Sequence, residues 1–118
     1  MIDGGAGNDW IEAGDGDVYV IGGFGRNVLD GGLGADTMVG EDNSDTMFGG
    51  QGNDRLCGGA GQDVLLGGDG QDELVGAGDN DNLFGDAGDD ELYGGTDHDT
   101  FTEAKGSTSC SVVQATTA

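Results

Sequence analysis

The chain has 118 residues, of which 24 are acidic, three are basic and none is proline, so its formal net charge is -21 at pH 7. The length fits a single domain, and so large a negative charge argues against nucleic acid or an anionic membrane as a partner. Glycine loses more backbone freedom on folding than any other residue, so the 28 glycines and the charge together predict disorder unless cations offset the repulsion.

The N-terminal residues show no export signal. No basic region precedes an apolar stretch, and no segment is long enough to span a bilayer, so neither Sec-type export nor a membrane span is expected. Ile2 stands nine residues before Ile11 and in register with it, which suggests a piece of a larger protein. Cys57 and Cys110 are too few for a disulfide framework and, with the single His98, too few for a zinc site. Both cysteines are expected to be free thiols.

Eleven nine-residue units run without an insertion from residue 4 to residue 102, each of the form Gly-Gly-x-Gly-x-Asp-x-apolar-x. Of the 28 glycines, 26 stand at the first, second and fourth places, which indicates backbone angles that a side chain would disfavour. The exceptions at the fourth place are of types that tolerate a left-handed conformation, namely Asn43, Asp79 and Asp97. The exceptions at the second place are Glu41, Ala77 and Asp86, which are less suited to a left-handed conformation, so looser turns are expected there.

The eighth place is apolar in every unit: Ile11, Val20, Leu29, Met38, Met47, Leu56, Leu65, Leu74, Leu83, Leu92 and Phe101. One inward side chain per unit predicts a very short strand made of the last three residues, after a six-residue turn. Two units then complete a coil of 18 residues, and residues i and i+18 stack. The predicted fold is all-β, a parallel β-roll or solenoid of about five and a half coils over residues 1–102. The Ser/Thr/Ala-rich tail, residues 103–118, is expected to be a cap or disordered.

Aspartate occupies the sixth place in nine of the 11 units. Stacking at i+18 separates the sixth places into two columns, the first Asp9, Asn27, Asp45, Asp63, Asp81 and Asp99, the second Val18, Asp36, Asp54, Asp72 and Asp90. Carboxylates about 5 Å apart within a column would repel one another unless a cation lay between them. The alternative is that these are solvated turn aspartates, but turn residues of that kind would not hold a nine-residue period.

The glycine pattern, the sixth-place aspartate and the eighth-place apolar residue resemble the RTX (repeats-in-toxin) family of calcium-binding nonapeptide repeats. The resemblance implies that Ca²⁺ bridges neighbouring carboxylates of a column and that turn carbonyls complete its shell, for example those around Gly49, Gly50, Gly52, Gly67, Gly68 and Gly70. Oxygen ligands of this kind suit Ca²⁺ better than Mg²⁺ or Zn²⁺. About five to seven ions are expected. The weakest bridges should be Val18/Asp36 and Asp9/Asn27, and the best Asp36/Asp54, Asp54/Asp72 and Asp45/Asp63.

Apolar burial in so narrow a core is small beside the entropy of ordering the chain, so binding and folding are expected to be one event. The resemblance implies a secreted bacterial protein that a type I machine exports unfolded and that folds outside the cell. Two alternatives stay open: an accessory C-terminal module of a secreted protease, lipase or alginate epimerase, and a structural or adhesive β-roll. An adhesive roll would need a regular outer row, which the seventh place does not show.

No metalloprotease, serine-hydrolase or cysteine-histidine motif is present, and a solvent-facing ladder of aspartates would lack a pocket for acid catalysis, so no enzymatic activity is expected. The ninth place is often apolar. Its side chains are expected to face outward, where they either mark docking on a neighbouring domain or a second copy, or reflect the general preference of sheets for such residues. The two columns are Ile21, Val39, Cys57, Val75 and Tyr93, and Phe48, Leu66 and Phe84.

Overall fold

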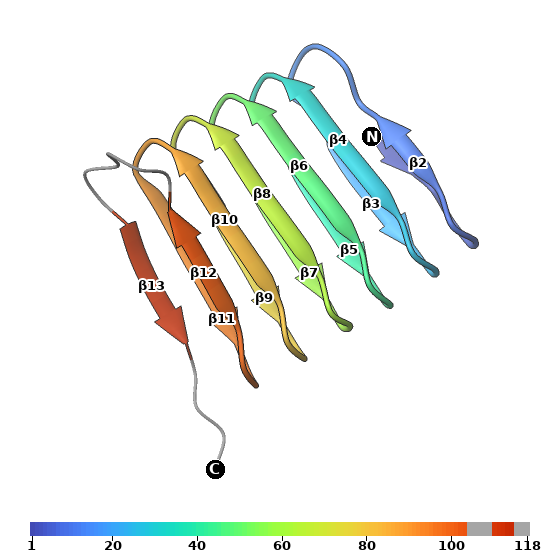
Figure 1. Ribbon diagram of the computed structural model, residues 1–118. Coiled ribbons are helices and arrows are strands. Elements are labelled where there is room, and N and C mark those ends of the chain that lie inside the picture. Colours follow the sequence, from blue (N-terminus) through green and yellow to red (C-terminus); the bar gives the residue numbers. More distant parts are fainter. Residues whose placement is uncertain (104–109, 115–118) are drawn as a thin grey trace.

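A computed structural model describes residues 1–103 and 110–114, which form two parallel sheets (Figure 1). One sheet contains, in spatial order, β1 (Ile2–Asp3), β3 (Tyr19–Gly23), β5 (Thr37–Glu41), β7 (Arg55–Gly59), β9 (Glu73–Ala77), β11 (Asp90–Gly95) and β13 (Cys110–Gln114). The other contains β12 (Thr100–Glu103), β10 (Asn82–Ala87), β8 (Val64–Asp69), β6 (Thr46–Gln51), β4 (Val28–Leu33) and β2 (Trp10–Glu12). The described residues include no helix that could cross a membrane.

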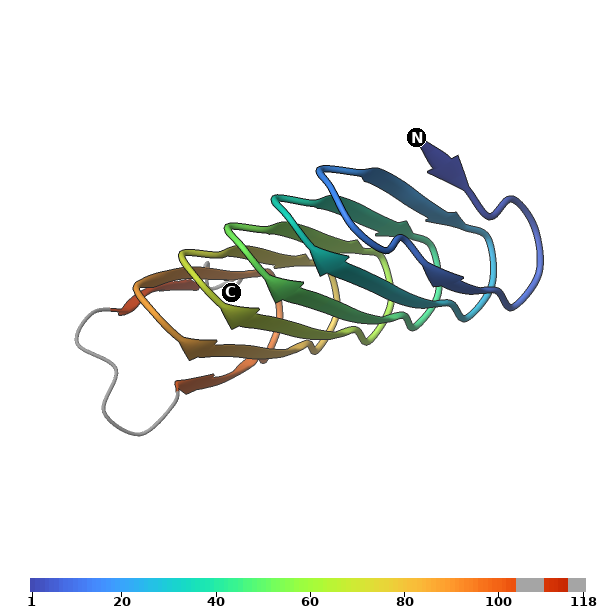
Figure 2. The same ribbon diagram turned by 90° about the horizontal axis from the view of Figure 1, so that it is seen from above.

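Each strand pairs with the strand one full coil away. Leu56 lies opposite Met38 on one side and Leu74 on the other. Leu65 is likewise flanked by Met47 and Leu83. The offset is 18 residues in each case, so two units complete one coil and successive coils stack along the axis, as the view from above shows (Figure 2). The predicted all-β parallel β-roll is confirmed.

The strands are longer than the three residues expected. In β6 and its neighbours the extended chain runs from the seventh place through the first two or three places of the next unit. Alternate residues of an extended chain face the same side, so the eighth and first places of these strands are buried together with the sixth place, which directly precedes them. The expectation of one inward side chain per unit was therefore wrong. From the third unit onward, the first two places of each unit extend the strand into the segment that the sequence predicts as a turn.

The apolar core is a double row of eighth-place side chains between the two sheets. Ten of them, from Ile11 to Leu92, are buried, and Phe101 packs against them at the C-terminal end of the row. At the other end Ile2, Ala13 and Val18 are partly buried against the same row. Only one apolar side chain per nine residues is fully enclosed, so the rest of the interior must be filled by the first and sixth places.

Left-handed backbone is kept where glycine is replaced. The only described residues other than glycine with positive φ are the six predicted exceptions, at 67° to 83°: Glu41, Asn43, Ala77, Asp79, Asp86 and Asp97. These residues therefore keep the positive φ that glycine has at the same places in the other units. In the tail, β13 pairs with β11, and the other residues from 104 onward lie outside the described part of the chain.

Candidate metal centre

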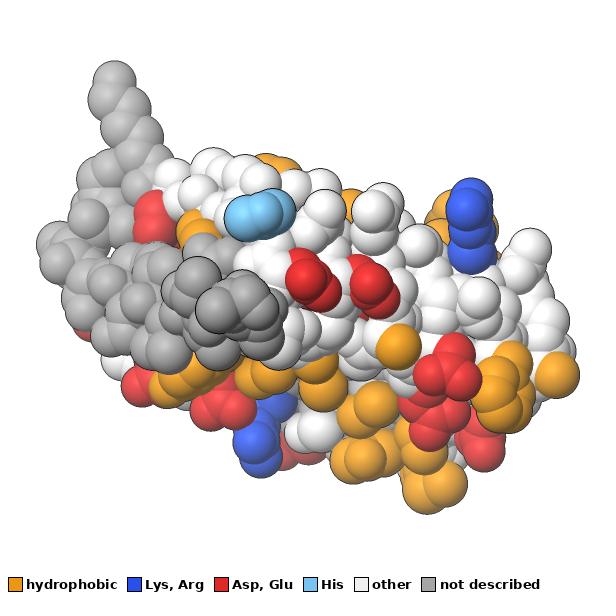
Figure 3. Space-filling view, turned by 90° about the horizontal axis from the view of Figure 1, so that it is seen from below, with side chains coloured by type: hydrophobic (Ala, Val, Ile, Leu, Met, Phe, Trp, Pro, Cys, Tyr) orange, Lys and Arg blue, Asp and Glu red, His pale blue; other side chains and the backbone are white. Residues whose placement is uncertain are grey.

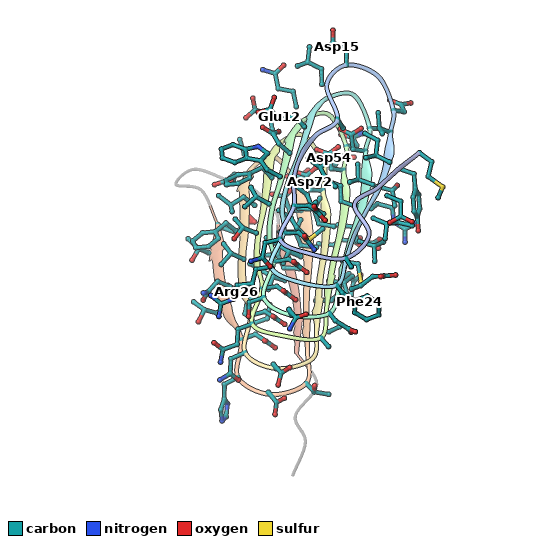
Figure 4. The ribbon with its side chains drawn as sticks, turned by 90° about the vertical axis from the view of Figure 1, so that its right-hand side faces the viewer. Glu12, Asp15, Phe24, Arg26, Asp54 and Asp72 are labelled. Atoms are coloured by element: carbon teal, nitrogen blue, oxygen red, sulfur yellow. The ribbon has the colours of Figure 1, made fainter. Side chains whose placement is uncertain are left out.

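The sixth-place side chains lie inside the solenoid. Eight of them are at most 3% exposed: Asn27, Asp36, Asp45, Asp54, Asp63, Asp72, Asp81 and Asp90. Figure 4 shows Asp54 and Asp72 within the coils, whereas Glu12, Asp15 and Arg26 point outward. The expectation of a solvent-facing ladder was wrong, because the sixth place shares the inner side of the extended chain with the eighth. The acidic columns are part of the core.

Backbone hydrogen bonds join each column into a continuous ladder. The Asp36 N–H donates to Oδ1 of Asp54 at 2.8 Å, and the Asp54 N–H donates to Oδ1 of Asp72 at 2.8 Å. The first column repeats this, with the Asp45 N–H donating to Asp63 at 2.8 Å and the Asp63 N–H to Asp81 at 2.9 Å. One carboxylate oxygen of each aspartate is thus fixed by the preceding coil, and the predicted stacking of both columns is present.

The second carboxylate oxygen is buried and has no hydrogen-bond donor among the described residues. This holds for Oδ2 of Asp9, Asp36, Asp45, Asp54, Asp63, Asp72, Asp81 and Asp90. A buried acceptor without a donor costs about 1–3 kcal/mol, and more when it is charged. Eight such atoms in so small a fold therefore require a proton or a cation on each.

The pKa values of the buried aspartates also show that their charged forms lack stabilising partners in the metal-free chain. Burial, opposed by the backbone hydrogen bond to Oδ1, raises the pKa of Asp63, Asp72 and Asp81 to about 7. The same cause raises the pKa of Asp45, Asp54 and Asp90 to about 6. Desolvation of the charged form exceeds the stabilisation from a single N–H donor, so a charged column needs further positive charge.

Asn27 shows what surrounds the unpaired oxygen. Its Nδ2 donates to the carbonyl oxygens of Gly23 and Gly25, both at 3.3 Å, and these are the second and fourth places of its own unit. Because the units repeat the same geometry, the corresponding carbonyls of an aspartate unit lie near Oδ2, where there is no amide hydrogen. The Oδ2 atom and the two carbonyl oxygens then lie together without a hydrogen-bond donor, and a single cation can bind all three. The sequence predicted Asn27 only as a weak ligand and missed its amide donors.

The first-place glycine leaves room beside these oxygens. A Cβ on Gly31 would lie 2.6 Å from Oδ2 of Asp36 and 2.6 Å from the carbonyl oxygen of Gly49 in the next coil. Among the 11 units only one has another residue at this place, Ala13, and that unit has Val18 in place of the aspartate. Where the carboxylate is absent, a methyl group is accommodated. This paired exception was visible in the sequence and indicates that the first and sixth places share one space.

The peptide oxygens predicted as ligands lie in these units. Gly49, Gly50 and Gly52 are the first, second and fourth places of the unit that holds Asp54, and Gly67, Gly68 and Gly70 are those of the unit that holds Asp72. The carbonyl of Gly67 faces the missing Cβ of Gly49, next to Asp54. No group of three or more Asp, Glu, His or Cys side chains converges within the described residues. A cation here would depend on backbone oxygens as well as carboxylates, a set that fits Ca²⁺.

A model of the RTX calcium-binding nonapeptide repeat matches the chain four times, at residues 3–38, 30–65, 39–74 and 66–101. The chain belongs to the RTX calcium-binding repeat family. RTX nonapeptide repeats bind calcium, so the oxygen-lined spaces between the coils of this RTX solenoid fit the ion that the family binds. No curated protein and no solved structure matches this RTX chain.

The raised carboxyl pKa values predict how the metal-free fold depends on pH. A carboxyl whose pKa is raised from 3.8 to about 7, as for Asp63, keeps a proton in the fold that the unfolded chain has lost. The metal-free fold should therefore be most stable near pH 4 and lose stability as the pH rises to about 7, while Ca²⁺ affinity should rise over that range. Circular dichroism of the chain in chelator between pH 4 and pH 8 measures this.

Two variants test this pH dependence, one at a buried aspartate and a control at an exposed one. Asp63→Asn removes a buried titrating group and should reduce the loss of stability between pH 4 and pH 7, whereas Asp42→Asn, at an exposed residue, should leave it close to that of the unmodified chain. A β signal in chelator that grows with rising pH would contradict the assignment.

Proposed function

We propose that this chain is a calcium-gated folding module without catalytic activity. The observation that carries the proposal is the set of eight aspartates whose Oδ2 atoms are buried and have no donor among the described residues. Without Ca²⁺ at neutral pH, folding would bury these charges unpaired. With Ca²⁺, the same atoms become ligands, so the free energy of ion binding becomes free energy of folding.

We assign the ions to pairs of carboxylates that are neighbours in a column. The best are Asp36/Asp54, Asp54/Asp72 and Asp45/Asp63, followed by Asp72/Asp90, Asp63/Asp81 and Asp81/Asp99; a replaced glycine occurs in the turns of each pair in the second group and in that of Asp45. Val18 offers no ligand, and the amide of Asn27 already satisfies its carbonyls. We therefore expect few or no ions in the first coil and about five to seven along the whole chain.

Membership of the RTX family and a net charge of -21 support a place outside the cell. A chain that stays unfolded at low cytosolic calcium can pass a type I export machine and fold where calcium is plentiful. The second candidate is an accessory module of a secreted protease, lipase or alginate epimerase. In that arrangement this chain would perform the same calcium-dependent folding beside a separate catalytic domain.

Docking through the ninth-place columns stays a prediction. In one column Ile21, Val39, Val75 and Tyr93 are half-buried, and in the other Phe48 is 38% exposed while Leu66 and Phe84 are half-buried. Figure 3 shows hydrophobic side chains gathered with acidic ones on one face of the solenoid. A mixed face of this kind suits a neighbouring domain or a second copy of the chain.

Far-UV circular dichroism of the chain during a Ca²⁺ titration tests the proposed function. The β signal should be absent in chelator at neutral pH and appear cooperatively by about 10 mM Ca²⁺, the weak end of extracellular calcium sites. The same concentrations of Mg²⁺ should not induce it. A complete β-roll signal in chelator at neutral pH would overturn calcium gating in favour of a constitutive structural role.

A further inference from the structure

Glu103 lies one residue beyond the last nine-residue unit, at the first place of what would be the next one. Its strand, β12, is the last of its sheet, and Glu103 pairs with Asp86 of β10 after a shift in register. Both carboxylate oxygens of Glu103 are buried and have no hydrogen-bond partner among the described residues. This arrangement is unlike the repeat, because the complete units carry glycine or alanine at this place.

The carboxylate of Glu103 lies near the unpartnered oxygen of Asp90. A Cβ placed on Gly85 would contact Oε1 of Glu103 and would lie 2.7 Å from Oδ2 of Asp90. The two carboxylates therefore approach the same point from opposite coils. Asp90 is 2% exposed, and its Oδ2 also has no hydrogen-bond partner in the described part of the chain. Two buried carboxylates that face one point without a donor repel each other unless a cation lies between them.

The repeat provides Asp90 with a neighbouring carboxylate on one side only, that of Asp72. Its column runs Val18, Asp36, Asp54, Asp72 and Asp90, and the residue 18 positions further on is Thr108. Glu103 supplies the missing negative charge from a different place in the unit. Asp86 and Gly88, at the second and fourth places beside Asp90, correspond to Gly23 and Gly25, whose carbonyls Asn27 binds. The same oxygen environment is therefore expected at this end of the column.

We propose that Glu103 and Asp90 form a terminal Ca²⁺ site that closes the C-terminal end of the second aspartate column. This site rests on the proposed function, because it presumes that the columns bind Ca²⁺, but its glutamate lies outside the nine-residue pattern. Glutamate can offer Ca²⁺ both of its oxygens, as both are free of donors here. The ion neutralises the last buried charges and fixes β12 against β10.

Native mass spectrometry and calcium-saturated hydrogen exchange test the terminal site. The unmodified chain is compared with Glu103→Gln and with a matched control, Glu12→Gln, in which the changed side chain is exposed on β2. E103Q should bind one ion fewer at saturating Ca²⁺, and its amides in β10 and β12 should exchange at least tenfold faster. E12Q should match the unmodified chain in both measurements. Glu103→Asp keeps a carboxylate and should retain the ion with a weaker affinity.

The outcomes separate the two proposals. If the unmodified chain binds several ions and E103Q binds the same number, the terminal site is wrong and the proposed function stands. If the unmodified chain binds none, the proposed function fails and the terminal site fails with it. Loss of one ion from E103Q and its retention in E103D would support the site even if E103Q is less stable overall.

Discussion

Replacing Gly49 by alanine should destabilise the calcium-bound fold by about 2–3 kcal/mol, as overpacking of a filled interior does, and should remove the ion held by Asp54. The added methyl group would contact the Gly67 carbonyl oxygen and would lie 2.6 Å from Oδ2 of Asp54. Gly49 does not have positive φ, so the effect comes from occupied space rather than from backbone strain. Urea unfolding in saturating Ca²⁺, together with an ion count, measures it.

Gly78→Ala is the matched control, because a Cβ there would come no closer than 3.8 Å to the nearest of the atoms considered. It should change stability little. Adding Asp54→Val to Gly49→Ala recreates the natural pair of Ala13 and Val18 and should restore part of the stability without restoring the ion. The shared-space explanation fails if G49A is as stable as G78A, or if the added valine lowers stability further.

Asp63→Ala and Asp63→Asn should have opposite effects in chelator. Asp63 is fully buried, and its Oδ1 accepts from the Asp45 N–H at 2.8 Å. Alanine leaves that N–H without its partner, which costs about 1–3 kcal/mol, and removes the ligands of two proposed bridges. Asparagine keeps the acceptor, and its amide can donate to the carbonyls of Gly59 and Gly61, as Asn27 does to Gly23 and Gly25.

D63N should therefore be more stable than the unmodified chain in chelator at neutral pH and less stable in saturating Ca²⁺. D63A should be less stable in both. Both variants should bind up to two ions fewer. Urea unfolding gives the comparison in Ca²⁺, and in chelator the comparison is the pH at which the β signal is lost as the pH rises from 4, with Asp42→Asn as the exposed control. Identical behaviour of D63N and D63A in chelator would mean that the amide of an asparagine does not replace the cation.

Much of the fold could be predicted from the sequence because each unit carries the same information. The period of nine, the apolar eighth place and the glycines together determine the 18-residue coil, and the registers follow from it. Even the six replaced glycines keep left-handed angles, as at Asn43 and Asp79, because neighbouring coils impose the chain path on them. A single unit has no neighbouring coils, so the regular backbone path depends on the stacking of coils.

The inner position of the aspartates could not be predicted as easily. Asp54 is charged and follows a glycine-rich segment, which is typical of an exposed turn. Its burial follows from the alternation of the extended chain, because Asp54 directly precedes β7 and lies two residues before the inward-facing Leu56. The site at Glu103 was missed for another reason. It is outside the repeat, and only the stacking of β12 on β10 brings it to Asp90.

Small-angle X-ray scattering of the chain at neutral pH tests the central claim, that calcium and the fold form together. The folded chain has a Cα radius of gyration of 13.0 Å, whereas an unfolded chain of 118 residues has a radius of about 35 Å. We predict the larger value in chelator and in Mg²⁺, and a cooperative fall toward the smaller value in Ca²⁺ alone. A radius near 13 Å in chelator would contradict the account, because the buried aspartates would then be stable without their ions.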